Sequence, residues 1–181
     1  MRFDELQLDE RTMLGIADAG FTECTPVQAA TLVHSLAGRD ICAQSQTGTG
    51  KTAVFLLTIF QRLKGVQGKK AMIIVPTREL AVQVEREAEL LGAHLDYRTA
   101  CIYGGVGYKS QEQQLKQGAN IIVGTPGRIL DLHRSGKLGF RDIAILVIDE
   151  ADRLFDMGFI ADLRKMLRAM PPVHKRQTML F

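Results

Sequence analysis

The chain has 181 residues, of which 46% are hydrophobic and 24% are charged, with a formal net charge of +3. This length suits one domain with a sizeable core, and the composition is that of a globular protein rather than a disordered or fibrous one. A charge this close to balance neither demands nor excludes a nucleic-acid partner.

The predicted elements alternate between helices and strands. In chain order we expect helices over residues 6–18 and 27–36, a strand over 40–43, a helix over 51–63, a strand over 71–75, a helix over 80–91, a strand over 98–103, a helix over 111–117, a strand over 120–123, a helix over 128–135, a strand over 143–149, a helix over 159–170 and a strand over 177–181. Strands joined by crossover helices predict an α/β fold, with a parallel sheet covered by helices on both faces.

Membrane and redox features point to one compartment. The longest apolar runs, residues 53–60 and 143–148, are too short to cross a bilayer, and the acidic beginning of the chain is unlike a signal sequence. Cys24, Cys42 and Cys101 are far apart and lack metal-ligand spacing, which is typical of a reducing compartment. We therefore expect a cytoplasmic protein with no membrane partner.

The first motif is a glycine-rich turn between a predicted strand and the helix over residues 51–63. It consists of Ser45, Gln46, Thr47, Gly48, Thr49, Gly50, Lys51 and Thr52. Gly48 and Gly50 allow the backbone to curl, so that several N–H groups point inward at the start of the helix, where phosphates bind. Lys51 would place a positive charge against terminal phosphates, and the Thr52 hydroxyl would hold Mg²⁺. The usual pattern has glycine at the position of Ser45, so a plain turn with a surface lysine remains the alternative.

The second motif follows the most apolar predicted strand and consists of Asp149, Glu150, Ala151 and Asp152. Acidic residues after a buried strand emerge at its carboxyl end, where open α/β sheets bind ligands. We expect Asp149 to hold Mg²⁺, partly through water, and Glu150 to orient and deprotonate an attacking water. The alternative is a group of acids that favours a helix N-terminus, a role that Asp152 would partly fill.

The acidic motif, with the Gly-Lys-Thr loop upstream, resembles the DEAD-box ATP-dependent RNA helicases. Other stretches match the family in its own order, and they are residues 20–28, 76–81, 104–105, 125–128 and 153–159. The resemblance covers essentially the whole chain. It implies a helical segment with an adenine-reading motif over residues 1–38, followed by a RecA-like ATP-binding domain over residues 39–181.

The resemblance implies that residues 20–28 read the adenine of ATP. The Gln28 amide offers a donor and an acceptor that match adenine in a bidentate pair and would select ATP over GTP. Phe3, at the place of the family's upstream aromatic, would stack on the base, and Thr25 would fix Gln28 or the phosphate loop. The alternatives are a helix-surface glutamine for Gln28 and core packing for Phe3 and Phe21.

The resemblance further implies that residues after strand ends contact RNA. Hydroxyls, backbone N–H groups and helix N-termini can hold a phosphate backbone without reading its sequence. The residues concerned are Pro76, Thr77, Arg78, Gly104, Gly105, Thr125, Pro126, Gly127 and Arg128. Taken alone, residues 125–128 would equally suit a helix cap and residues 104–105 a plain turn.

The resemblance finally implies a function for a longer protein. The family's Ser-Ala-Thr motif and second RecA-like domain would follow Phe181, so we expect a truncated chain whose Asp152 couples to that domain. ATP and Mg²⁺ would then drive local unwinding of RNA, and the half alone would not unwind. Expected partners are single-stranded or duplex RNA, the second domain in cis and proteins of an RNA-processing complex. The competing hypotheses are a DNA translocase or small-molecule kinase, and a non-catalytic ATP-dependent clamp.

Overall fold

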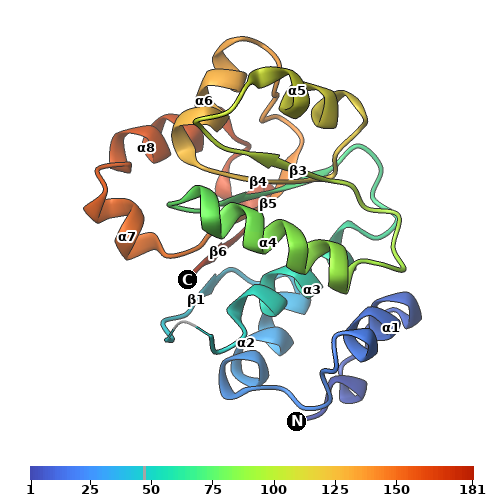
Figure 1. Ribbon diagram of the computed structural model, residues 1–181. Helices are drawn as coiled ribbons and strands as arrows, with labels where there is room; N and C mark the ends of the chain where they lie inside the picture. The colour runs from blue at the N-terminus through green and yellow to red at the C-terminus, as the bar shows by residue number, and fades with distance from the viewer. Residues whose placement is uncertain (47) are drawn as a thin grey trace.

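The computed structural model describes residues 1–46 and 48–181, and within these residues six parallel strands form one sheet. The strand order across the sheet is β1-β6-β5-β2-β4-β3 (Figure 1). The strands are β1 (Ile41–Cys42), β2 (Lys70–Ile74), β3 (Thr99–Ile102), β4 (Ile121–Gly124), β5 (Ile143–Ile148) and β6 (Gln177–Leu180). The predicted parallel sheet is therefore confirmed, with each strand within about two residues of its expected bounds.

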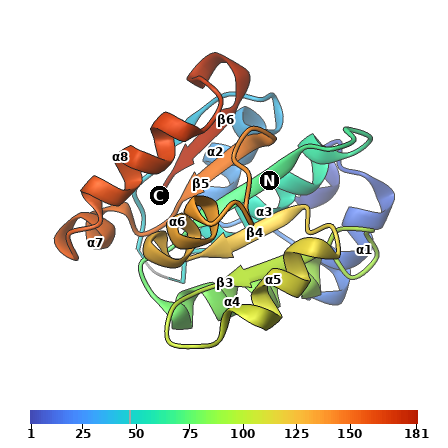
Figure 2. The same ribbon diagram turned by 90° about the horizontal axis from the view of Figure 1, so that it is seen from above.

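Helices cover both faces of the sheet. They are α1 (Glu10–Asp18), α2 (Pro26–Leu36), α3 (Lys51–Leu63), α4 (Arg78–Leu91), α5 (Tyr108–Lys116), α6 (Pro126–Arg134), α7 (Ala151–Asp156) and α8 (Ile160–Ala169), with 3₁₀ turns over Phe3–Glu5 and Val173–Lys175. Helices α1 to α4 lie on one side of the sheet, and α5 to α8 lie on the other (Figures 1 and 2). Among the described residues, no helix is both long and apolar enough to pass through a membrane.

Strand β2 shows how the sequence builds two cores. Ala71 and Ile73 face the layer of α3 and α4, whereas Met72 and Ile74 face the layer of α6 to α8. Successive side chains of a strand point to opposite faces, so a strand covered on both sides must be apolar throughout. The continuous apolar run in the sequence reflects this double burial.

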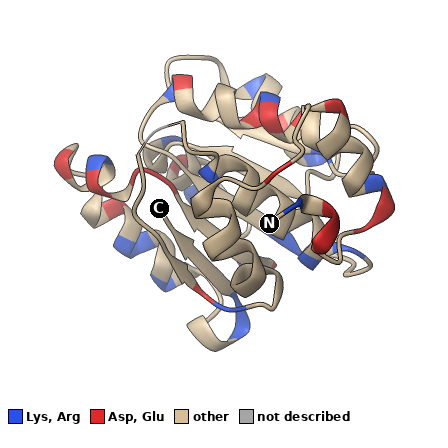
Figure 3. Ribbon diagram, turned by 90° about the horizontal axis from the view of Figure 1, so that it is seen from below, with Lys and Arg blue, Asp and Glu red and all other residues tan. Residues whose placement is uncertain are grey.

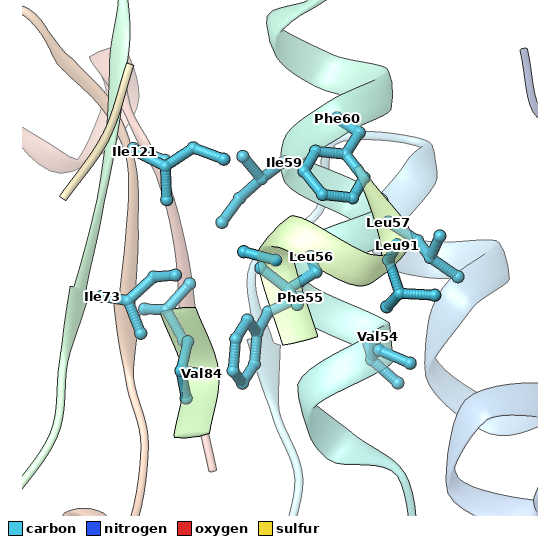
Figure 4. Close-up of a cluster of buried hydrophobic side chains, with 14 of the residues drawn as sticks. Val54, Phe55, Leu56, Leu57, Ile59, Phe60, Ile73, Val84, Leu91 and Ile121 are labelled. Carbon is cyan, nitrogen blue, oxygen red and sulfur yellow. The ribbon is translucent and has the colours of Figure 1, made fainter. Parts of the chain in front are cut away.

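Helix α3 is the central element of the first core. Its residues 53–60 are buried against α2, α4 and the sheet, as the close-up of this cluster shows (Figure 4). A helix that is apolar on all sides requires such enclosure. Because α3 is held from every side, its first residues, Lys51 and Thr52, are carried on a rigid support.

The helix starts differ from the expected ones where polar side chains cap them. Helix α1 begins at Glu10 rather than at residue 6, because the Asp9 carboxylate accepts a hydrogen bond from the Arg11 N–H at 3.0 Å. The expected helix over 159–170 is preceded by a separate short helix, α7. Gly158, with φ of +82°, lies between α7 and α8 and ends the first of them.

Candidate nucleotide-binding and RNA-binding sites

The phosphate loop connects β1 to α3 and is closed by its own polar groups. Gly48 and Gly50 have φ of +80° and +88°, and Gly50 is the residue from which α3 starts. Lys51 Nζ donates to the Ser45 carbonyl at 2.8 Å, so the lysine folds back across the loop. Thr47 lies outside the described residues.

Ser45, the departure from the usual glycine, takes part in this closure. Thr49 Oγ1 donates its proton to the Gln46 carbonyl at 2.8 Å. The Ser45 hydroxyl, 2.8 Å from Thr49 Oγ1, must therefore be the donor in their contact. The serine adds a hydrogen bond to the loop and does not prevent the turn from forming.

Thr25 and Gln28 tie helix α2 to the phosphate loop. The Thr25 N–H donates to Gln28 Oε1 at 2.9 Å, which forms half of a capping box. The Thr25 hydroxyl then donates to the Thr49 carbonyl at 2.7 Å, and Gln28 Nε2 donates to the Gly50 carbonyl at 3.1 Å. Gln28 is only 3% exposed, so the surface-glutamine alternative is wrong.

Glycine is required at position 50 by this tie. A Cβ atom there would lie 2.4 Å from Gln28 Nε2, closer than any real contact. The conformation with φ of +88° also disfavours other residues. The Gln28 amide keeps one proton and one lone pair beyond the bonds described, which is the capacity that a base contact would use.

The two aromatics near the N-terminus exchange their expected places. Phe3 is 2% exposed and packs under Phe21, with ring centroids 6.0 Å apart and planes at 20°. Phe21 is 39% exposed. This corrects the expectation for Phe3, whose ring is buried as the core-packing alternative proposed, whereas the exposure of Phe21 argues against core packing for that ring.

A hollow of about 510 Å³ lies between the phosphate loop, α4 and the end of β5. Such a volume is within the range of small-molecule sites. Its lining combines the residues that follow the phosphate loop and β5, which are Lys51, Thr52, Asp149, Glu150 and Arg153, with the apolar side chains of Phe21, Leu80, Leu90 and Leu91. The hollow thus offers both groups that can bind phosphate and an exposed aromatic ring.

Asp149 is a buried carboxyl at the carboxyl end of β5. It is 4% exposed, its N–H donates to the Ile74 carbonyl at 3.0 Å, and its Oδ1 accepts from the Glu150 N–H at 3.0 Å. Burial raises the pKa of Asp149 above its ordinary value, and the charges of Glu150 and Glu87 act in the same direction. The Glu150 N–H and the charge of Lys51 oppose this rise.

The donors at this end suit Mg²⁺. The Thr52 hydroxyl and the Asp149 carboxylate are hard oxygen ligands of the kind that Mg²⁺ prefers. Among the described residues, no group of three or more His, Cys, Asp or Glu side chains could hold a metal ion alone. The remaining ligands would be phosphate oxygens and water, which is the usual way in which Mg²⁺ enters a nucleotide site.

Replacing Asp149 with asparagine should stabilise the fold at neutral and higher pH. Asparagine keeps the acceptor for the Glu150 N–H but removes a charge that burial disfavours. When a carboxyl has a higher pKa in the folded state, the free energy of unfolding of the protein falls as the pH rises through that pKa. In acid the carboxyl is neutral in both states, so the advantage of the variant should vanish there. Urea unfolding of both proteins across pH 3–8 measures this, and a less stable variant at pH 8 would contradict it.

Glu150 adopts an unusual backbone conformation for a residue with a side chain. Its φ and ψ are 49° and 51°, and it is the N-cap of α7. Such left-handed residues cost free energy and concentrate at functional sites. Its Oε2 accepts from Arg153 Nη1 at 3.0 Å. We did not single out Arg153 from the sequence, although its spacing of three from Glu150 could have indicated the pair.

The strand-end residues meet because of the strand order. Strands β2, β4 and β3 are neighbours, so residues 76–78, 125–128 and 104–105 lie at the same edge of the sheet. Thr77 caps α4 by accepting from the Leu80 N–H at 3.2 Å, and the Arg78 guanidinium lies 4.9 Å from the centre of the Tyr103 ring.

Accessible groups at this edge include the exposed Arg78 after β2 and groups of the loops after β3 and β4. Gly104 and Gly105 are exposed, and Gly127 is half-buried. The Thr125 hydroxyl makes no capping bond within the described helix α6, so it stays available to a ligand. Pro76 and Pro126 are buried and serve the backbone geometry rather than a contact.

Arg128 departs from its expected role as a phosphate ligand. It is 9% exposed, and its Nη2 donates to the Val106 carbonyl at 2.9 Å. Its guanidinium also lies 4.0 Å from the centre of the Tyr108 ring. Arg128 therefore holds the loop that carries Gly104 and Gly105, and Tyr108, 45% exposed, is the accessible side chain of that pair.

Asp152 lies at the start of α7, next to the phosphate loop. It is exposed, and its Oδ1 accepts from the Arg153 N–H at 2.8 Å. It lines a second hollow of about 440 Å³ with Ser45 and Lys51. Its coupling to another domain stays a prediction.

The parallel sheet, the phosphate loop before α3 and the acidic end of β5 define a RecA-like domain of the P-loop class. The family model "DEAD/DEAH box helicase" matches residues 25–181, and the chain belongs to that family.

Curated relatives and solved structures agree with this assignment. "ATP-dependent RNA helicase RhlB" of Idiomarina loihiensis is 44% identical over 187 residues, covering 99% of this chain and 44% of the relative. The protein of the same name from Haemophilus influenzae is 45% identical, covering 99% and 45%. The chain thus spans less than half the length of these relatives.

The solved structures are similar over essentially the whole chain. A DEAD box protein from Methanococcus jannaschii matches with a TM-score of 0.94 and 39% identity, covering 100% of this chain and 49% of that one. A hypothetical ATP-dependent RNA helicase from Sulfolobus tokodaii matches with a TM-score of 0.86 and 35% identity, covering 96% and 50%.

Proposed function

We propose that the chain is the N-terminal half of an ATP-dependent RNA helicase, which in its full-length form couples ATP binding and hydrolysis to local unwinding of RNA. The observation that carries this proposal is the shared edge of the sheet. The nucleotide hollow and the strand-end loops both lie at the carboxyl ends of the parallel strands. Family membership and the names of the relatives support the same function.

The phosphates of ATP would lie on the loop of residues 45–52, with Lys51 against the terminal phosphates. Thr52 and Asp149 would hold Mg²⁺, which supplies charge neutralisation when bound. Glu150 would accept the proton of the attacking water, while its pair with Arg153 holds the carboxylate in place.

The adenine would lie against the apolar side chains that line the hollow. We assign the stacking contact to Phe21, because it is the exposed ring of the Phe3–Phe21 pair and lines the hollow. Gln28 would pair with the adenine edge while its bond to Gly50 connects the base contact to the phosphate loop.

RNA would be held through its backbone by Thr77, Arg78, Gly104, Gly105, Thr125 and Gly127. Arg128 would act through the loop that it supports rather than by contact. The second RecA-like domain would complete both sites through elements near Asp152. Proteins of an RNA-processing complex and a cytoplasmic location belong to the same proposal.

The test is the steady-state ATPase of the full-length protein with and without nucleic acid. Single-stranded RNA should stimulate turnover far more than single-stranded DNA of the same length. Stronger stimulation by DNA would indicate a translocase instead. ATP binding with no turnover under any condition would indicate a clamp.

Replacing Gln28 with alanine should change base selectivity. A bidentate pair to a base is worth about 1–3 kcal/mol of discrimination, so ATP affinity should fall roughly tenfold more than GTP affinity. Loss of the hydrogen bond to the Gly50 carbonyl should lower the affinity for both nucleotides. Competition binding against a fluorescent nucleotide measures both.

The matched control is Thr25→Ala, which removes the hydrogen bond from the Thr25 hydroxyl to the Thr49 carbonyl of the loop. The Thr25 side chain has no proposed contact with the base. It should lower ATP and GTP affinity equally. An equal loss of both nucleotides in Gln28→Ala would show that Gln28 only supports the loop.

A further inference from the structure

A third hollow, of about 370 Å³, lies at the opposite edge of the sheet, where the strands begin. It is bounded by the end of α3, the loop before β2 and the turn before β6. Within the part of the chain that the structure describes, its ionisable lining is entirely basic and consists of Arg62, Lys69, His174, Lys175 and Arg176. In the view from below, both basic and acidic stretches of the chain are seen (Figure 3).

These basic side chains have no ion-pair partners among the described residues, although seven other Lys and Arg side chains do. Arg62, Lys69 and Lys175 are exposed. Arg176 is half-buried, and burial lowers the pKa of its guanidinium, with only Asp40 acting against this. Like charges that outnumber the nearby opposite charges raise the local potential and attract an anion.

Two of the arginines lie against the backbone. A Cβ on Gly38, whose φ is +82°, would lie 3.0 Å from Arg62 Nη2, so the guanidinium of Arg62 lies close to this glycine. Arg176 Nη1 donates to the Pro171 carbonyl at 2.6 Å. The charge of Arg176 is therefore held in place by a hydrogen bond, and the exposed basic side chains lie around it.

We propose that this hollow binds the phosphate backbone of an RNA strand, as a contact additional to the strand-end loops. The proposal rests on the proposed helicase function. Phosphate contacts by Lys and Arg need no base recognition, and the described lining of the hollow includes no Phe, Tyr or Trp side chain to stack a base.

An acidic peptide fits the hollow less well. Peptide sites usually depend on apolar anchors that fill a pocket. Here Leu63 and Ile145 are 4% and 2% exposed, which leaves Val66 as the large apolar side chain open to a partner within the described lining. Charge is thus the main property that the hollow presents.

The position of the hollow defines which RNAs would use it. The strand-end loops and the hollow lie at opposite edges of the sheet, so a short strand bound at the loops cannot reach both. A long strand, or the region next to a duplex, would extend around the domain to the hollow. The added contact would hold substrate without adding sequence preference.

The test is a triple variant of the full-length protein, Arg62→Gln, Lys69→Gln and Lys175→Gln. Its control removes the same charge at exposed positions near β3, with Arg86→Gln, Arg98→Gln and Lys116→Gln. Binding of a short and a much longer oligouridylate is measured against salt, after thermal unfolding shows that both variants are folded. Each phosphate contact to a single strand adds about 0.7 to the salt slope, so the triple variant should lose about 2 units for the long strand.

The result is decisive in each direction. The short strand should bind the triple variant and the wild type equally and stimulate their ATPase equally. A salt slope for the long strand equal to that of the control would overturn this inference while leaving the helicase function intact. Loss of polyglutamate binding with unchanged RNA binding would reassign the hollow to acidic proteins. A wild type that neither binds nor responds to RNA would refute the helicase function itself.

Discussion

Lys51→Ala in the full-length protein is expected to abolish ATP turnover and to weaken ATP binding by roughly one to two orders of magnitude, since hydrogen bonds to charged groups contribute about 1.5–3 kcal/mol. Lys51 Nζ donates a hydrogen bond to the Ser45 carbonyl at 2.8 Å. This carbonyl is a neutral acceptor, which a charged phosphate oxygen would replace when ATP binds. Titration with ATP by calorimetry, together with steady-state ATPase, measures both effects.

The control for this variant is Lys116→Ala, which removes an equal charge from the last turn of α5. It should leave ATP affinity unchanged. Thermal unfolding should show that Lys51→Ala is folded, because the lysine is not part of the core. ATPase within twofold of the wild type would refute the assignment of Lys51.

Glu150→Gln in the full-length protein should retain ATP binding and lose turnover by a factor of about 10²–10⁴, the usual contribution of a general base. Glutamine has the same length and the same backbone preferences, so the left-handed conformation at φ 49° is not relieved. Single-turnover hydrolysis with radiolabelled ATP separates the chemical step from product release.

The same substitution weakens the contact with Arg153, and this needs its own control. Arg153→Ala breaks that pair but keeps the carboxylate. The pair is largely at the surface and contributes about 0–1 kcal/mol to stability. If Arg153→Ala lost turnover as severely as Glu150→Gln, the glutamate would be important for local structure rather than as the base.

The sheet and the phosphate loop could be predicted from the sequence because local rules and tertiary packing agree there. The apolar run of β5 is followed directly by Asp149, and strand ends at one edge of a parallel sheet must converge. The boundaries of α3 were predicted correctly, since Gly50 and an apolar run define them.

The exchange of Phe3 and Phe21 could not be predicted, because it depends on a long-range contact. Arg2 and Glu23 form an isolated antiparallel bridge, and the Cys24 N–H donates to the Met1 carbonyl at 2.9 Å. These backbone bonds place the first residues beneath the turn that carries Phe21. Residue type alone does not tell which of two aromatic rings lies underneath.

Arg128 shows the same limit for a charged residue. An arginine after a strand end favours a phosphate contact by its chemistry. Its hydrogen bond to the Val106 carbonyl and its contact with the Tyr108 ring depend on the path of the loop after β3, which no local pattern specifies. The sequence therefore predicted the edge of the sheet at which Arg128 lies but not the contacts that it makes there.

The pairing of β1 has a consequence for biosynthesis. β1, which leads into the phosphate loop, pairs with β6, and Ile41 lies opposite Met179, 138 residues later (179 minus 41). Contacts between such distant residues form late, because a long loop must close first. On the ribosome, the strand before the nucleotide loop would stay unpaired until nearly all of this domain has emerged. A nascent chain should therefore gain protection by ATP only after β6 has been synthesised, even though every residue of the loop is made early.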